Sequence, residues 1–93
     1  MRSTTPVHEL KNIGPVSAGW LAELGCRTRA DLEAMGAEMA YKILKHHHPR
    51  DVNLNLLYAL HGALTDTHWA ALPPEVKARL KAEAAAPLTI GPG

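Results

Sequence analysis

The stretch Leu54-Asn55-Leu56-Leu57-Tyr58-Ala59-Leu60-His61-Gly62-Ala63-Leu64 leaves few polar positions on any helical face. Asn53 precedes it, and asparagine is a favoured N-cap residue because its side chain accepts a hydrogen bond from the first turn of a helix. A helix that is apolar on most sides has to be covered by other parts of the protein. We therefore expect residues 54–64 to form the central and most buried helix of the fold.

On both sides of this stretch, Gly, Pro and capping residues divide the chain into further short helical segments, and no convincing strand pattern with a period of two occurs. Pro15 near the start of one segment and Gly25 at its end match the usual asymmetry of helix ends. Thr28, followed by Asp31, resembles a capping box. The helical segments or turns that we expect besides 54–64 are residues 8–12, 15–24, 28–36, 37–47, 69–72 and 73–86.

Composition supports an all-α fold. Of the 93 residues, 46% are hydrophobic but only 4% are aromatic, and there is no Phe, so a core must be built from Leu and Ala, which favour helices over sheets. The chain has the length of one domain. We predict a compact bundle of five to six short helices over residues 8–86, with an N-terminal extension at 1–7 and a flexible tail at 87–93.

Charge and cysteine content limit the function classes. The net charge is +1, far from the strong excess of a dedicated nucleic-acid binder, and residues 1–50 hold seven basic against five acidic side chains. Any anion-binding face should therefore lie in the first half. Cys26 is the only cysteine, which excludes an intramolecular disulfide and favours a buried, inert thiol. The chain shows no secretory signal and no apolar run of about 18 residues, so we expect a cytoplasmic protein without a membrane partner.

A first candidate site is the turn before residue 15. Backbone N–H groups and the positive helix end at Gly14–Ser17 can bind an anion, and Lys11 can add a charge. Asn12 tolerates the left-handed backbone that such a turn needs. The opposing interpretation is a purely structural turn. The candidate phosphate contacts in this region are Lys11, Asn12, Gly14, Val16 and Ser17.

A second candidate is the acid-free stretch at the end of the helix expected at 37–47. It contains Lys42, Lys45, three consecutive histidines at 46–48, and Arg50. The lysines and Arg50 are candidate phosphate contacts, although cations at a helix C-terminus are also favoured simply by the helix dipole. Neighbouring helical histidines point in different directions and make a poor metal site. No metal or cofactor site and no catalytic motif is recognisable, so an enzyme is not expected.

The segment around residues 10–32 resembles a helix-hairpin-helix motif. The residues that carry this resemblance are Leu10-Lys11-Asn12-Ile13-Gly14-Pro15-Val16-Ser17-Ala18, Leu21, Leu24-Gly25-Cys26, Thr28 and Asp31-Leu32. The motif implies that backbone N–H groups at the start of its second helix meet a nucleic-acid phosphate. Asn12 stands where the family commonly has its first glycine, and Val16 where it has a basic or small polar residue.

Over residues 8–86 the chain resembles the C-terminal domain of the TfoX/Sxy family of competence regulators. The resemblance rests on Leu10-Lys11-Asn12-Ile13-Gly14-Pro15, Trp20-Leu21, Leu24-Gly25, Asp31-Leu32, Gly36-Ala37, Tyr41, Leu54-Asn55-Leu56-Leu57-Tyr58-Ala59-Leu60, Gly62-Ala63-Leu64, His68-Trp69 and Leu72-Pro73. It implies an all-α domain that takes part in regulating natural transformation with other transcription factors. Larger members place a separate domain before this one, whereas seven residues precede the match here, which favours a free-standing domain.

Two functions follow as alternatives. The first is an interaction domain with a protein partner, in which exposed Trp20, Tyr41 or Trp69 anchors the interface. Trp69 can instead fill the core. The second is weak, non-specific nucleic-acid binding through the Gly14 turn together with basic side chains of the first half. Those side chains are Lys11, Arg27, Arg29, Lys42, Lys45 and Arg50. The sequence does not indicate an oligomeric state.

Overall fold

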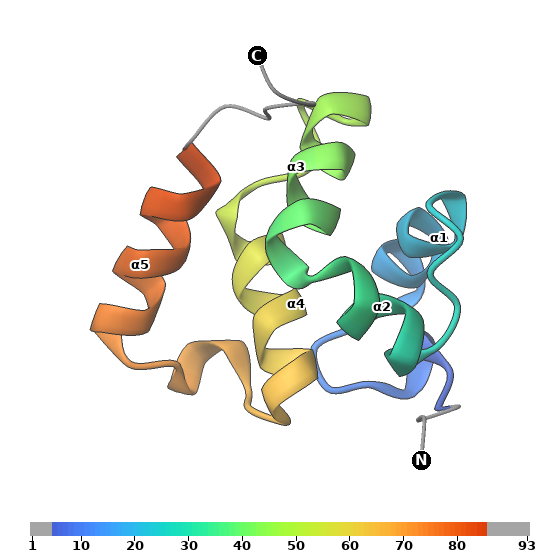
Figure 1. Ribbon diagram of the computed structural model, residues 1–93, viewed down its shortest axis with the longest axis horizontal. Coiled ribbons are helices and arrows are strands. Elements are labelled where there is room, and N and C mark those ends of the chain that lie inside the picture. Colours follow the sequence, from blue (N-terminus) through green and yellow to red (C-terminus); the bar gives the residue numbers. More distant parts are fainter. Residues whose placement is uncertain (1–4, 86–93) are drawn as a thin grey trace.

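The computed structural model describes residues 5–85, and it confirms the all-α fold (Figure 1). Within this range there is no strand, and the only β-type pairing is an isolated bridge between Pro6 and Thr28. The elements are η1 (Val7–Glu9), α1 (Pro15–Glu23), α2 (Arg29–Met35), α3 (Ala37–His47), α4 (Leu54–Thr65), η2 (Trp69–Ala71) and α5 (Pro74–Ala85), where η denotes a 3₁₀ turn.

The helix ends follow the capping signals of the sequence. The Thr28 hydroxyl accepts a hydrogen bond from the Asp31 N–H at 3.3 Å, and the Asp31 carboxylate accepts one from the Thr28 N–H at 3.2 Å, so the capping box is present. Asn53 caps α4 by accepting from the Asn55 N–H at 2.9 Å. The end of α1 comes one residue earlier than expected, at Glu23, and Gly25 follows with a positive φ of 80°.

The centre of the fold is α4, as its apolar sequence predicts. Figure 1 shows α3 and α4 side by side in the middle of the molecule, with α5 on one side and α1 and α2 on the other. Leu57 and Leu60 of α4 and Leu44 of α3 are completely buried. Each such side chain stabilises the folded state by about 1.5–3 kcal/mol through burial of apolar surface. The other large side chains with almost no exposure are Leu21, Leu32, Val52 and Cys26.

The N-terminal part only partly resembles a helix-hairpin-helix. Its second arm is α1, but its first arm is the three-residue 3₁₀ turn η1 at Val7–Glu9 rather than the turn expected at 8–12. The motif is therefore not confirmed. The expected tail at 87–93, residue 86 of the last helix and most of the N-terminal extension lie outside the described residues. None of the described helices has the length and apolar character needed to cross a bilayer.

Candidate functional site

Asn12 has a structural role in the turn that precedes α1. Its φ of 73° is left-handed, as the sequence suggested. The Asn12 side-chain amide donates to the carbonyl oxygens of Thr67 at 2.9 Å and Ala59 at 3.3 Å. The Asn12 Oδ1 atom accepts from the backbone N–H of Trp69 at 3.2 Å. The side chain thus ties the turn to α4 and to η2, and all of its polar atoms are occupied within the fold.

The start of α1 is accessible to solvent, but the positive charge of the nearby Lys11 is partly neutralised by Asp66. Gly14 is the N-cap residue and provides no side-chain hydrogen bond to the first turn. Val16 in that turn is 65% exposed, and Ser17 is partly exposed. The nearby cation Lys11 has its ammonium 3.8 Å from a carboxylate oxygen of Asp66. The helix start is therefore open to solvent, with a loosely paired lysine beside it.

The two candidate lysines of α3 are held by neighbouring groups. The Lys42 ammonium lies 2.9 Å from the Glu38 carboxylate, and its side chain is only 12% exposed. The Lys45 ammonium donates to the carbonyl oxygens of Pro49 at 2.8 Å and Val52 at 2.7 Å, which fixes the loop after α3. These partners match the structural interpretation of a cationic helix end better than a free phosphate-binding patch. Arg50 remains exposed.

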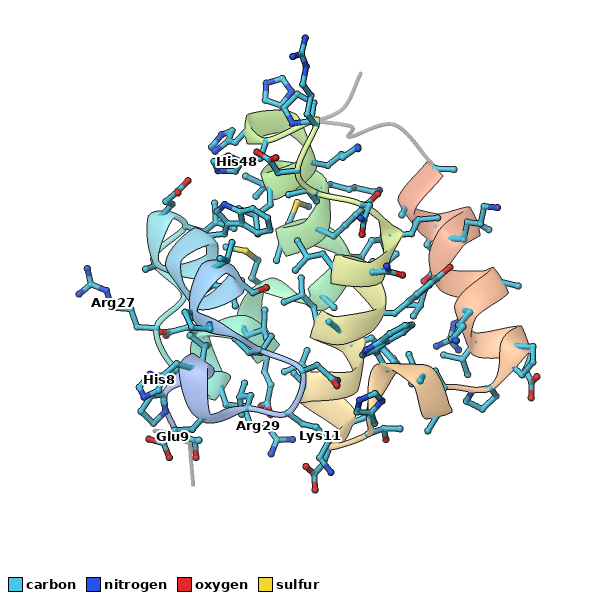
Figure 2. The ribbon with its side chains drawn as sticks, turned by 180° about the vertical axis from the view of Figure 1, so that it is seen from behind. His8, Glu9, Lys11, Arg27, Arg29 and His48 are labelled. Carbon is cyan, nitrogen blue, oxygen red and sulfur yellow. The ribbon has the colours of Figure 1, made fainter. Side chains whose placement is uncertain are left out.

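The basic candidates do not form one continuous surface. Figure 2 shows Lys11 and His48 at opposite ends of the molecule. His48 follows α3 directly and marks the end that carries Lys45 and Arg50. Arg29 donates to the Leu64 carbonyl oxygen at 2.8 Å and forms an ion pair with Glu33. The structure thus separates the Gly14 turn from the basic stretch at the end of α3.

The histidines and Cys26 have structural surroundings. The imidazole Nε2 of His48 lies 3.1 Å from the Glu23 carboxylate, and its ring stacks on Trp20 with centroids 5.3 Å apart. Within residues 5–85, no three His, Cys, Asp or Glu side chains are grouped closely enough to hold a metal ion. Cys26 is buried, and its pKa is raised by that burial and by the negative charge of Asp31. A raised pKa keeps the thiol protonated and unreactive.

The three aromatic candidates differ in exposure. Tyr41 is only 7% exposed, so the expectation of an exposed anchor there is wrong. Tyr41 belongs to the core, and its pKa is raised mainly by burial and to a lesser extent by the electrostatic interaction with Tyr58. Trp69 is 37% exposed and does not fill the core, because η2 leaves it at the surface, where the Lys77 ammonium lies 5.6 Å from its ring centroid. Trp20 is partly buried.

A groove brings Trp20 of α1 and Trp69 of η2 to one site. Its volume is about 340 Å³. Leu56 of α4, which is largely buried in the fold, lines the groove, and polar side chains supply much of the remaining lining. The lining residues are Ser17, Trp20, Asp51, Asn53, Asn55, Leu56, Ala59 and Trp69.

Sequence reasoning singled out three of these residues, Ser17, Trp20 and Trp69, but did not place them together. It missed the contributions of Asp51 and Asn55. The signal for Asn55 was a polar residue inside an otherwise apolar helix. Its place in the same groove as a tryptophan of α1 depends on how the helices pack, which no local pattern contains.

Residues 5–85 thus define a small all-α domain that bears an aromatic groove on its surface. The family model of the TfoX C-terminal domain matches residues 3–84, and the chain belongs to this family. It is a regulatory type of domain family and not a known enzyme family. No curated protein matches the chain. A solved structure of an uncharacterized protein from Listeria monocytogenes, in a triclinic crystal form, is similar, with 31% identity and a TM-score of 0.77 over 83% of this chain and 86% of that one.

Proposed function

We propose that the protein is a non-enzymatic interaction domain that serves TfoX-type regulation of natural competence through protein–protein contacts. The groove between Trp20 and Trp69 is the proposed contact site for a segment of the partner. The observation that carries this proposal is the meeting of exposed Trp69 and partly buried Trp20 with polar side chains around one hollow. Membership in the TfoX C-terminal domain family supports the regulatory setting.

The chemistry of the groove suits a protein segment. Tryptophan is enriched among the residues that contribute most to protein interfaces, because it buries a large area while its N–H finds a polar partner. Leu56 is among the lining residues and adds apolar surface against which an apolar group can pack. The amide of Asn55 offers both donors and an acceptor to a partner's backbone.

Site-specific photocrosslinking tests the proposal. The photoreactive residue p-benzoylphenylalanine is placed at Ser17 or Asn55 in the groove, and at exposed Glu75 on α5 as the matched control. We expect the groove positions to yield the same discrete protein adduct after irradiation in cells, and the control position to yield none. The partner identified by mass spectrometry is then purified, and direct binding to the intact chain is measured.

A second variant sharpens the result. Trp69→Ala should abolish the adduct while leaving the helical content unchanged, because Trp69 is exposed and lies outside the core cluster. Equal adducts from Glu75, no adduct from the groove, or a purified partner that binds Trp69→Ala as well as the parent protein would each refute the proposal.

Weak duplex binding is the second candidate function. The observation that favours it is the start of α1, where Gly14 leaves the first turn without a side-chain cap. If phosphates bind there, affinity should fall steeply with salt, and Lys11→Glu should weaken it while Lys81→Glu on α5 should not. Affinity that is insensitive to salt would remove this candidate.

A further inference from the structure

The groove has a distinctive charge. Asp51 is the only acidic residue among those that line it, and no basic residue is among them. Asp51 is exposed, and no ion pair with it occurs within residues 5–85. The neighbouring His48 interacts with the Glu23 carboxylate instead. The lining therefore presents a carboxylate that has no positive partner within the described fold.

The aromatic borders of the groove also suit a cation. An indole face attracts a cation that lies within about 6 Å of its centroid. The chain itself provides an example, because the Lys77 ammonium lies 5.6 Å from the Trp69 centroid. The Trp20 ring stacks on the imidazole of His48, with an interplanar angle of 26°. Each tryptophan of the groove therefore already packs its ring against a nitrogen-containing side chain, the Lys77 ammonium at Trp69 and the His48 imidazole at Trp20.

We propose that the groove recognises an arginine side chain in the partner protein, with Asp51 as the residue that determines this preference. This inference rests on the proposed function. A guanidinium is planar, stacks on aromatic rings and donates two parallel hydrogen bonds to a carboxylate, which an ammonium does not do. The same carboxylate repels a phosphate, so the groove is a site for a basic protein segment and not for a nucleic-acid backbone.

The amides beside Asp51 give the site direction. The Oδ1 atom of Asn53 is occupied by the N–H of Asn55, so the amide NH₂ of Asn53 remains the group that can donate outward. The Asn55 side chain has no intramolecular hydrogen bond among the bonds found within residues 5–85, and it lines the groove. These amides can bond to the peptide backbone on either side of the arginine, while Asp51 binds its head group.

The test uses two small probes of nearly the same shape. N-acetyl-arginine amide and its neutral counterpart N-acetyl-citrulline amide are titrated into the ¹⁵N-labelled intact chain. The signals to follow are the indole N–H groups of Trp20 and Trp69 and the side-chain amide of Asn55. We expect saturable shifts that are confined to the groove, with the arginine probe binding at least about fivefold more tightly than the citrulline probe.

Asp51→Asn should reduce arginine binding to the level of citrulline. The matched control is Asp66→Asn, because Asp66 is an exposed aspartate that does not line the groove. Asp66 has a left-handed backbone conformation, which asparagine also tolerates. The spectrum of each variant reports whether the fold is kept. The control should bind arginine as the parent protein does.

Equal affinity for both probes, or arginine binding that survives Asp51→Asn, would overturn the inference. If photocrosslinks at Ser17 and Asn55 still form in that case, the interaction groove stands and only its charge preference is wrong. If neither probe shifts a groove signal and no groove crosslink forms, both the inference and the proposed function fail.

Discussion

Replacement of Asn12 tests whether this residue is a structural clamp or a phosphate contact. In Asn12→Ala the protein loses two hydrogen bonds donated to Ala59 and Thr67 and one accepted from Trp69. It also places alanine at a φ of 73°, where the methyl group is strained. A residue whose only role is to touch phosphate would leave the stability of the free protein unchanged.

The expected magnitude follows from these contacts. Each intramolecular hydrogen bond contributes about 0.5–1.5 kcal/mol net, and the left-handed alanine costs about 1 kcal/mol. Because water can replace some partners at this partly exposed site, we expect Asn12→Ala to lower the free energy of unfolding by about 3 kcal/mol. A domain of this size has roughly 5–14 kcal/mol in total. The corresponding drop in Tm is roughly 12–24 °C.

The assay is urea unfolding followed by far-ultraviolet circular dichroism. Asn12→Gly separates the two contributions, because glycine accepts the left-handed backbone but makes none of the hydrogen bonds. It should be about 0.5–1 kcal/mol more stable than Asn12→Ala, after allowance for the greater entropy of the unfolded glycine chain. Asn55→Ala is the control, and it should change stability by less than about 0.5 kcal/mol. If Asn12→Ala is as stable as this control, the clamp interpretation is refuted.

Three further predictions address the packing and the titratable groups. Gly62→Ala should destabilise the protein by at least about 2 kcal/mol, because the added Cβ atom would collide with the Thr67 backbone oxygen. Gly19→Ala in α1 should instead stabilise it by about 0.5–1 kcal/mol, because no atom lies within contact distance of the added Cβ atom. Thermal unfolding of the two variants measures both changes in stability. Cys26 should react with a thiol reagent only as the protein unfolds, since it is buried with a raised pKa, and rapid labelling without denaturant would contradict this. Burial and the positive charge of Arg79 lower the pKa of His61 in the folded protein below its ordinary 6.5. The unfolded chain therefore binds the proton more readily, and the free energy of unfolding should fall as the pH drops below about 6.5. His61→Gln should show a weaker pH dependence in urea titrations, and an unchanged dependence would disprove the assignment.

Helix positions were predictable from the sequence because their signals act over a few residues. Thr28 and Asp31 form the capping box that their spacing indicates, and Asn53 caps α4. Pro15 begins α1 as expected. In each case the hydrogen-bond partner or the fixed φ lies within one turn of the chain. The apolar composition of α4 likewise predicted its central position.

The roles of the candidate site residues were harder to predict. Lys45 was a candidate phosphate contact with an ordinary cationic helix end as the alternative, and the sequence did not reveal that its ammonium holds the loop at Pro49 and Val52. Tyr41 was expected at the surface, but α4 and α5 pack beside α3 and bury it. A sequence pattern gives the face of a helix on which a side chain lies. It does not state which neighbouring element covers that face.

The amino-acid sequence by itself determined that this protein consists of short helices, where each α-helix begins to within one residue, and that α4 is covered by the others. Only the tertiary structure decided that Asn12 bonds to Ala59, Thr67 and Trp69, and that Trp20 and Trp69 border one groove with Asp51. The physical reason is range. Helix propensity and capping depend on residues within about four positions, whereas burial and pairing depend on contacts between segments far apart in the chain, which exist only once the bundle has packed.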